Sequence, residues 1–354
     1  MGVWVGASAR GLWCVLFCAV SSACSNVRAA PVCIQEDTVI RSFAETESNV
    51  IFVTLDGVRF QEFYEGADRA LSGGDKGAAF PRFWASIARQ GQVYDARIAN
   101  PIHLSLPGYQ SVFAGAEQPC GGNDCGQIRV QTFPERLVED LGLPRQSVAS
   151  FASWTGIARA VESRPGATFV DVGQKCEIVG QDPWSGRPHA EQAPSAGESA
   201  RPDELTMSRA LRHLERQRPA FLYISLNDAD EEAHRGRYDL YMATLRRYDR
   251  WIEALVNQLG HMGEYGRRTA LLITTDHGRG QGARWTDHGA KRVGDADARI
   301  WIYLRLPESG RFTFAAPAAR YTHLDLRPTI ETLYGLMPRM GSGLGASLVV
   351  AAVR

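Results

Sequence analysis

The stretch of residues 271–280, LLITTDHGRG, constrains the fold more than any other part of the sequence. Residues 271–275 are apolar and then β-branched, which is typical of a buried strand. Asp276, His277 and Gly278 follow at once. This order predicts a carboxylate and an imidazole at the carboxyl end of a strand, where open α/β sheets bind ligands. The alternative is an ordinary turn, because Asp and Gly are common turn residues.

Two other apolar runs end in the same way. Residues 49–55 lead into Asp56, and residues 219–226 lead into the acidic segment DADEEAH at 228–234. Helical patterns separate these runs, so the sequence predicts an α/β fold with a mainly parallel central sheet and helices on both faces. Acidic residues that follow parallel strands would then meet at one edge of the sheet. The other expected strands are 92–98, 147–151 and 299–306, and the expected helices are 80–90, 105–113, 132–141, 202–216, 237–259 and 327–336.

Composition is that of a globular protein with ample material for a core: 44% of the 354 residues are apolar and 22% are charged. Lys+Arg and Asp+Glu number 39 each, so the formal net charge is zero. That balance provides no electrostatic basis for a nucleic-acid-binding surface. We expect residues 31–354 to form a single domain, in which the Gly-, Pro-, Ser- and Ala-rich segment 180–201 is a surface loop or small insertion.

The first 30 residues predict a signal peptide. Arg10 supplies a positive charge, residues 11–20 form an apolar run too short to span a bilayer, and small residues follow at 21–23. Cleavage is expected after Ala23 or near Ala29. Cys24 offers an alternative, a lipid anchor at the new N-terminus. No later segment is long and apolar enough to be transmembrane, so we expect export to the periplasm or secretion.

Four cysteines remain after such a cleavage: Cys33, Cys120, Cys125 and Cys176. An even number of cysteines in an exported protein favours two disulfides. Cys120 and Cys125 are close enough in CGGNDC to pair locally, which would leave Cys33 to pair with Cys176. The alternative is that these residues are free buried thiols.

Carboxylates, imidazoles and one hydroxyl form the candidate site: Asp56, Ser105, Asp230, His234, Asp276, His277 and His288. Asp230 and His234 are four positions apart and can share one metal ion from a strand-end loop or a helical turn. Carboxylates mixed with imidazoles suit zinc or manganese. Seven groups are too many for one tetrahedral ion and suit two. Two cations about 4 Å apart can bind the attacking and leaving oxygens of an in-line displacement.

The same segments resemble the alkaline phosphatase superfamily, which includes nucleotide pyrophosphatase/phosphodiesterases, phosphomutases and sulfatases. VTLDGVRFQEFY resembles the opening strand and Asp of the phosphodiesterase branch, and SLPGYQSVFAG resembles its nucleophile segment. DADEEAH fits the family's Asp-x-x-x-His pattern, and TTDHG fits its Asp-His-Gly. HLDLRPTIETLYG resembles the closing helix of the superfamily. The likeness extends from about residue 49 to residue 335.

This resemblance implies an exported hydrolase of small-molecule phosphate esters, a phosphodiesterase or a phosphomonoesterase, with two divalent cations, zinc with manganese as the alternative. Ser105 would be the nucleophile and form a phosphoseryl intermediate. One cation would be surrounded by Asp56, Ser105, Asp276 and His277, and the other would be held by Asp230, His234 and His288. Asn123 resembles the asparagine that binds a phosphoryl oxygen in the phosphodiesterases. The alternative for Asn123 is a turn residue between two cysteines.

Departures from the family pattern bear on the substrate. Sulfatases that form formylglycine need an Arg four residues after the modified position, and here that position is Tyr109. We therefore expect an unmodified Ser105 and phosphate esters, with sulfate esters as the second hypothesis and an inactive ligand-binding relative as the third. Asp228 competes with Asp230 as the metal ligand, and the spacing to His234 favours Asp230. For His103 the alternatives are a contact with substrate and a structural role, and the structural role is expected.

Overall fold

The computed structural model describes residues 48–74, 77–173, 180–181, 188–189, 200–289, 295–338 and 343–352. The predicted signal peptide, Cys24 and the predicted pair Cys33–Cys176 lie outside the described residues, as does most of segment 180–201. Within the described ranges, no helix combines the length and apolar character needed to cross a membrane. The assignment of residues 31–354 to one domain stays a prediction.

An eight-stranded sheet forms the centre of the fold, in the order β11-β2-β9-β8-β1-β7-β3-β4. Strand β1 is parallel to both β7 and β8, β3 is parallel to β4 and β7, and β11 is parallel to β2, whereas β9 is antiparallel to β2 and β8. The mainly parallel sheet is confirmed. Its strands are β1 (Asn49–Leu55), β2 (Gln92–Arg97), β3 (Val148–Ala152), β4 (Phe169–Val172), β7 (Phe221–Leu226), β8 (Thr269–Thr274), β9 (Arg299–Arg305) and β11 (Tyr321–Thr322). Two small sheets pair β10 (Phe312–Phe314) with β12 (Val349–Ala351) and β5 (Gly180–Gln181) with β6 (Pro188–His189).

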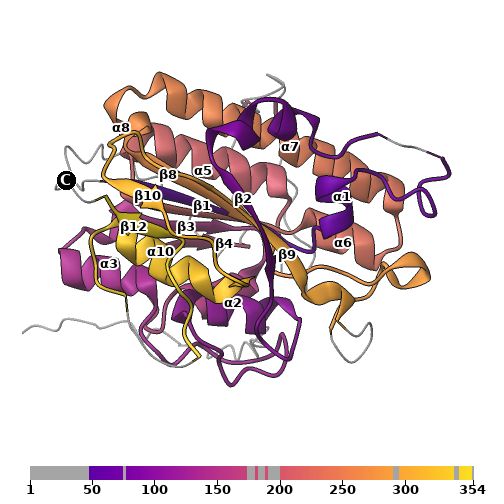
Figure 1. Ribbon diagram of the computed structural model, residues 1–354, viewed down its shortest axis with the longest axis horizontal. Coiled ribbons are helices and arrows are strands. Elements are labelled where there is room, and N and C mark those ends of the chain that lie inside the picture. Colours follow the sequence, from indigo (N-terminus) through magenta and orange to yellow (C-terminus); the bar gives the residue numbers. More distant parts are fainter. Residues whose placement is uncertain are drawn as a thin grey trace, which may run out of the picture.

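Helices cover both faces of the central sheet (Figure 1). Helices α5 and α7 pack on one face, and α2, α3 and α10 pack on the other. The alternation of side chains along β1 explains how one strand serves two cores. Ile51 and Val53 pack with α5 and α7, whereas Val50 and Phe52 pack with the opposite helices. The helices are α1 (Phe60–Tyr64), α2 (Ser105–Ala114), α3 (Phe133–Leu141), α4 (Ala158–Val161), α5 (Asp203–Gln217), α6 (Asp228–His234), α7 (Tyr238–His261), α8 (Glu264–Arg267) and α10 (Leu326–Leu333).

Strand register brings the acidic segments to one edge of the sheet. Leu55 at the end of β1 is paired with Leu226 at the end of β7, and Thr54 is paired with Thr274 at the end of β8. Because all three strands run in the same direction, the segments that follow them leave from the same edge. The expected convergence of acidic residues at that edge is confirmed.

The helix predicted over residues 80–90 is present from residue 81 to residue 90, but most of it is not α-helical. The chain forms a π-helical turn at Phe83–Ile87 and a 3₁₀ turn at Ala88–Gln90. The carboxylate of Asp249, on α7, accepts hydrogen bonds from the backbone N–H groups of Arg82 and Phe83. These contacts come from an element 166 residues away along the chain, so local periodicity carries no information about them.

Candidate metal centre

Asp56, Asp276 and His277 form a buried group at the carboxyl edge of the sheet. One ligand atom from each residue lies within 4.8 Å of the others. Asp56 follows β1 directly, whereas Asp276 and His277 come just after β8. The Nε2 atom of His277 lies 3.4 Å from Oδ1 of Asp56 and 3.4 Å from Oδ2 of Asp276. We call these three residues the first ligand group.

In the part of the chain that the structure describes, each carboxylate of the first ligand group has one oxygen that accepts a hydrogen bond and one that does not. Tyr109 donates its hydroxyl to Oδ2 of Asp56 at 3.1 Å, and the N–H of Gly57 donates to Oδ1 of Asp276 at 3.1 Å. Among the described residues, the buried atoms Oδ1 of Asp56 and Oδ2 of Asp276 have no hydrogen-bond partner. The Nδ1 atom of His277 lies 2.9 Å from the carbonyl oxygen of Gly278. In this contact Nδ1 carries the proton and donates it to the carbonyl oxygen. Nε2 is then unprotonated and offers its lone pair, as in histidines that bind metals.

The pKa values of the first ligand group are shifted by burial and by repulsion between carboxylates. Burial, followed by repulsion from Asp276 and Asp230, raises the pKa of Asp56 well above its ordinary value. Burial raises the pKa of Asp276 to about 7, and it lowers the pKa of His277 to about 4. Two crowded carboxylates with unpartnered oxygens beside a neutral imidazole fit a divalent cation, whose charge offsets the repulsion.

Asp230, His234 and His288 form a second ligand group. Asp230 and His234 are one turn apart on α6, and Nε2 of His234 lies 3.0 Å from Oδ2 of Asp230. The Nε2 atoms of His234 and His288 are 3.1 Å apart. The Nδ1 atom of His288 lies 2.9 Å from the carbonyl oxygen of His103, which leaves its Nε2 facing the group. Burial lowers the pKa of His288 to about 3, so this imidazole is neutral and can act as a ligand.

The two ligand groups adjoin each other. The rings of His277 and His288 stack with their centroids 3.8 Å apart and their planes 11° apart. Asp228, which competed with Asp230 in the sequence analysis, instead pairs with Arg247 at 3.0 Å and is not part of either ligand group. The choice of Asp230 by its spacing to His234 therefore agrees with the geometry of α6.

Ser105 lies at the start of α2, beside the first ligand group. Its Oγ atom is 3.2 Å from Nε2 of His277, and the residue is buried. The N-terminus of a helix favours an anion through its dipole and its N–H groups. The structure thus brings this hydroxyl next to both the candidate cation ligands and a favourable position for an anionic substrate.

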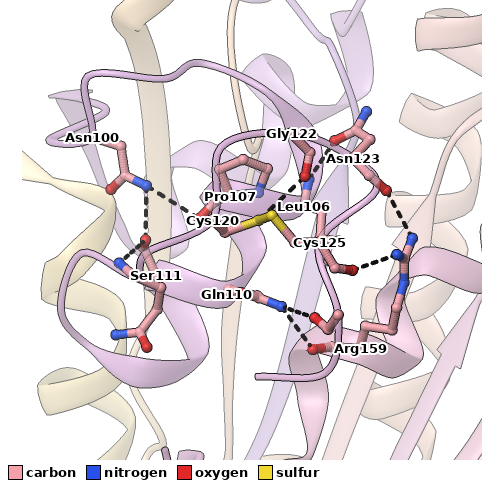
Figure 2. Close-up of a disulfide and its surroundings, with 12 residues drawn as sticks. Asn100, Leu106, Pro107, Gln110, Ser111, Cys120, Gly122, Asn123, Cys125 and Arg159 are labelled. Atoms are coloured by element: carbon pink, nitrogen blue, oxygen red, sulfur yellow. Dashed lines mark hydrogen bonds between the residues drawn. A yellow bond between two sulfur atoms is a disulfide. The ribbon is translucent and has the colours of Figure 1, made fainter. Parts of the chain in front are cut away.

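Asn123 also contacts the start of α2. Its Oδ1 atom accepts a hydrogen bond from the N–H of Leu106 at 2.9 Å (Figure 2). A disulfide joins Cys120 to Cys125 around it, which confirms the predicted local pairing. Arg159, on α4, donates to the carbonyl oxygens of Asn123 and Cys125. The loop that carries Asn123 is therefore closed by the disulfide and held to α4 by Arg159.

Sequence reasoning missed Arg279, two positions after His277. Its guanidinium is fully buried and donates to Oδ1 of Asp230, and its Nη2 atom lies 3.2 Å from Nδ1 of His234. Although burial by itself would raise the pKa of Asp230, the positive charge of Arg279 overrides it and holds that pKa below its ordinary value. The signal in the sequence was an arginine inside the glycine-rich turn DHGRG, but its partners are on another element.

Asp297 is a second residue that sequence reasoning did not single out. Its side chain is fully buried and lies 2.5 Å from Nδ1 of His103, and it also accepts a hydrogen bond from the N–H of Gly289. Its backbone carbonyl accepts from the N–H of Gly278 at 2.8 Å. Asp297 therefore connects the residues beside His277, the residue beside His288 and the segment that leads into Ser105. The role of His103 in this structure is to link Asp297 to His288.

Comparison with known proteins identifies the class to which this arrangement belongs. Residues 196–294 match the family model described as the Metalloenzyme superfamily. That segment contains both histidine-bearing halves of the centre, from α6 to His288. No curated protein matches the sequence.

Solved structures with the same fold include a 2-O GAG sulfatase, with a TM-score of 0.56 and 13% identity, covering 86% of this chain and 73% of that chain. The lipoteichoic acid synthase LtaP from Listeria monocytogenes has a TM-score of 0.52 and 14% identity, with 86% and 76% covered. The phosphonate monoester hydrolase of Agrobacterium radiobacter has a TM-score of 0.53 and 14% identity, with 85% and 76% covered. The fold is thus alkaline-phosphatase-like. With the family-model match over residues 196–294, this confirms the resemblance drawn from the sequence: the fold is alkaline-phosphatase-like, and the matched segment is similar to the Metalloenzyme superfamily, which implies divalent metal ions.

Proposed function

We propose that this protein is an exported hydrolase of phosphate esters that uses two divalent cations and Ser105 as its nucleophile. One observation carries the proposal: the Ser105 hydroxyl lies at a helix N-terminus 3.2 Å from Nε2 of His277, and that nitrogen is 3.4 Å from each of two buried carboxylate oxygens that have no hydrogen-bond partner among the described residues. A phosphate ester is an anion whose reaction needs an oxygen nucleophile and positive charge near the same point.

In this proposal, the first ligand group (Asp56, Asp276 and His277) holds one cation and the second (Asp230, His234 and His288) holds the other. Zinc is the proposed metal, and manganese is the alternative, because both accept mixed carboxylate and imidazole ligands. When bound, the cations favour the alkoxide form of a hydroxyl and offset the negative charge on phosphoryl oxygens.

Ser105 would attack phosphorus through Oγ, releasing the alcohol of the ester and forming a phosphoseryl intermediate. Water would then cleave the bond between phosphorus and Oγ and restore the serine. Since Oδ1 of Asn123 already accepts from Leu106, its Nδ2 group is the end left to donate to a phosphoryl oxygen. The dipole of α2 would favour the negative charge held beside Ser105.

Tyr109 supports phosphate rather than sulfate esters. This residue lies one turn after Ser105, where a formylglycine-forming sulfatase needs an arginine. Its hydroxyl donates to Oδ2 of Asp56, so the position supports a candidate cation ligand instead. An unmodified serine at position 105 can serve as the nucleophile of a phosphoryl transfer.

Export is part of the proposal, to the periplasm or outside the cell, with a lipid anchor at Cys24 as the alternative. The signal-peptide pattern of residues 1–30 supports it, and so does the disulfide between Cys120 and Cys125, since disulfides persist in oxidising compartments. N-terminal sequencing of the protein recovered from the cell envelope or the medium would test it.

The decisive experiment measures turnover of four chromogenic substrates in one preparation whose metal content is known. These are a phosphate monoester, a phosphate diester, a phosphonate monoester and a sulfate ester. We expect turnover of a phosphorus ester and a loss of about 1,000-fold or more in Ser105→Ala. Ser86→Ala is the matched control, because Ser86 is exposed and its hydroxyl donates to the carbonyl oxygen of Arg82, one turn earlier in the same segment. Preference for the sulfate ester, or no turnover with both cations bound, would contradict the proposal.

A further inference from the structure

Arg279 is a charged group that contacts the second ligand group without being a candidate ligand. Its Nη1 atom donates to Oδ1 of Asp230, which leaves Oδ2 facing His234 at 3.0 Å. The arginine therefore pairs with the single carboxylate of the second group while the three ligand atoms still converge.

The position of Arg279 is held from two further sides. Its Nε atom donates to the carbonyl oxygen of Trp285 at 3.0 Å, and its Nη2 group donates to the carbonyl oxygen of Thr286. Gly57 allows the close packing: a Cβ there would lie 2.5 Å from Oδ1 of Asp230 and 3.0 Å from Nη1 of Arg279. The positive φ of Gly57, +67°, also favours glycine. The guanidinium therefore cannot leave without rearrangement of the surrounding backbone.

The two ligand groups consequently differ in charge. The first has two carboxylates, Asp56 and Asp276, and among the described residues neither forms an ion pair with an arginine or a lysine. The second has one carboxylate, and Arg279 already neutralises it. With neutral imidazoles and with the carboxylates ionised, as cation binding requires, the first group carries a formal charge of −2, and the second group together with Arg279 carries zero. A fixed positive charge a few ångströms from a cation site opposes cation binding.

We propose that Arg279 makes the two cation sites unequal, so that the first ligand group binds its cation tightly and the second binds weakly until an anion is present. A phosphoryl group between the sites would add negative charge next to the second site and raise its affinity. By thermodynamic linkage, the second cation raises the affinity for the anion by the same factor. This inference rests on the proposed two-cation function, and it adds an order of loading to it.

The test is a titration of the metal-free full-length protein with Mn²⁺. Calorimetry and electron paramagnetic resonance monitor the binding. We expect one tight site and one site that is at least about tenfold weaker. Inorganic phosphate should tighten the weak site and change the tight one little. These readouts measure binding and do not depend on turnover.

Three variants separate charge from packing. Arg279→Gln removes the positive charge and should tighten the second site about tenfold or more, whereas Arg279→Lys keeps the charge and should leave it weak. Arg299→Gln is the control, because Arg299 pairs with Asp95 and stacks over Phe60 outside both ligand groups. It should leave both affinities unchanged.

Two outcomes would overturn the inference and a third would overturn the function beneath it. Equal affinities in the wild-type protein, or unequal affinities that persist in a folded Arg279→Gln, would contradict the role of Arg279. If Arg279→Gln does not fold, the wild-type affinities and their response to phosphate decide the question. Absence of any Mn²⁺ or Zn²⁺ binding would contradict the two-cation function itself.

Discussion

The Oγ atom of Ser105 lies 3.2 Å from Nε2 of His277, although 172 positions separate the two residues in the chain. Ser105 starts a helix on one face of the sheet, and His277 follows a central strand. The contact exists because α2 begins at the carboxyl edge of the sheet, where His277 also lies. A nucleophile and a candidate cation ligand thereby meet at the boundary between helix and sheet, and the following predictions concern the residues around that point.

Replacing Asp276 by Asn should separate metal binding from folding. The variant loses one of two charged oxygen ligands, so we expect loss of the tightly bound cation and at least a hundredfold loss of turnover. The metal-free variant should unfold at the same temperature as metal-free wild type or higher, because repulsion between Asp56 and Asp276 is removed. Metal analysis and calorimetry check both points. Asp95→Asn, at an exposed ion pair, is the control; a large drop in stability of metal-free Asp276→Asn would argue for a structural role instead.

Asp297→Asn should weaken the centre without unfolding the protein. The variant loses the charge that holds His103 and the N–H of Gly289, and His103 in turn bonds His288. We expect about a 10- to 100-fold loss of metal affinity at the second ligand group. Calorimetric metal titration is the measurement, with the melting temperature recorded in parallel. Asp295→Asn is the matched control two positions away, where the side chain is 87% exposed. Unchanged metal affinity in Asp297→Asn would refute a positioning role.

Loss of the disulfide should act through Asn123. In the Cys120→Ser/Cys125→Ser variant, the loop that presents Asn123 to Leu106 is no longer closed, so we expect KM to rise about tenfold with a smaller change in kcat. Asn123→Ala should produce a similar rise. Because both changes remove the same contact, the triple variant should be no worse than either. Additive effects would show that the disulfide and Asn123 act independently.

His213 should make stability depend on pH away from the metal centre. It lies on α5 against Phe151 and Phe169, and burial lowers its pKa to about 4. In the unfolded chain its pKa is about 6.5, so protons bind the unfolded state preferentially as the pH falls from 6.5 to 4. His213 therefore costs stability over that window, and the loss is complete below it. The free energy of unfolding, measured by urea unfolding, should fall between pH 7 and pH 4 in both proteins. We expect the fall to be about 1 to 2 kcal/mol smaller in His213→Phe than in wild type. Parallel pH curves for the two proteins would contradict this.

The sequence was informative where the signal is local and periodic. Apolar runs of the right length predicted β1, β7 and β8, and the acidic residues directly behind them predicted which edge of the sheet carries the candidate ligands. The i,i+4 spacing of Asp230 and His234 likewise predicted which of two aspartates lies beside that histidine. Each of these features depends on residues close together in the chain.

Tertiary structure alone decided the features that depend on distant contacts. The π-helical turn at Phe83–Ile87 arises beside Asp249, and the partners of Arg279 lie on α6 and in the segment before His288. Asp297 was not singled out from the sequence, although its carboxylate is fully buried against His103. Sequence by itself therefore determined the kind of sheet and the ligand types at its edge. The charge difference between the two ligand groups was decided by folding, because an arginine alters a site only when packing brings it there.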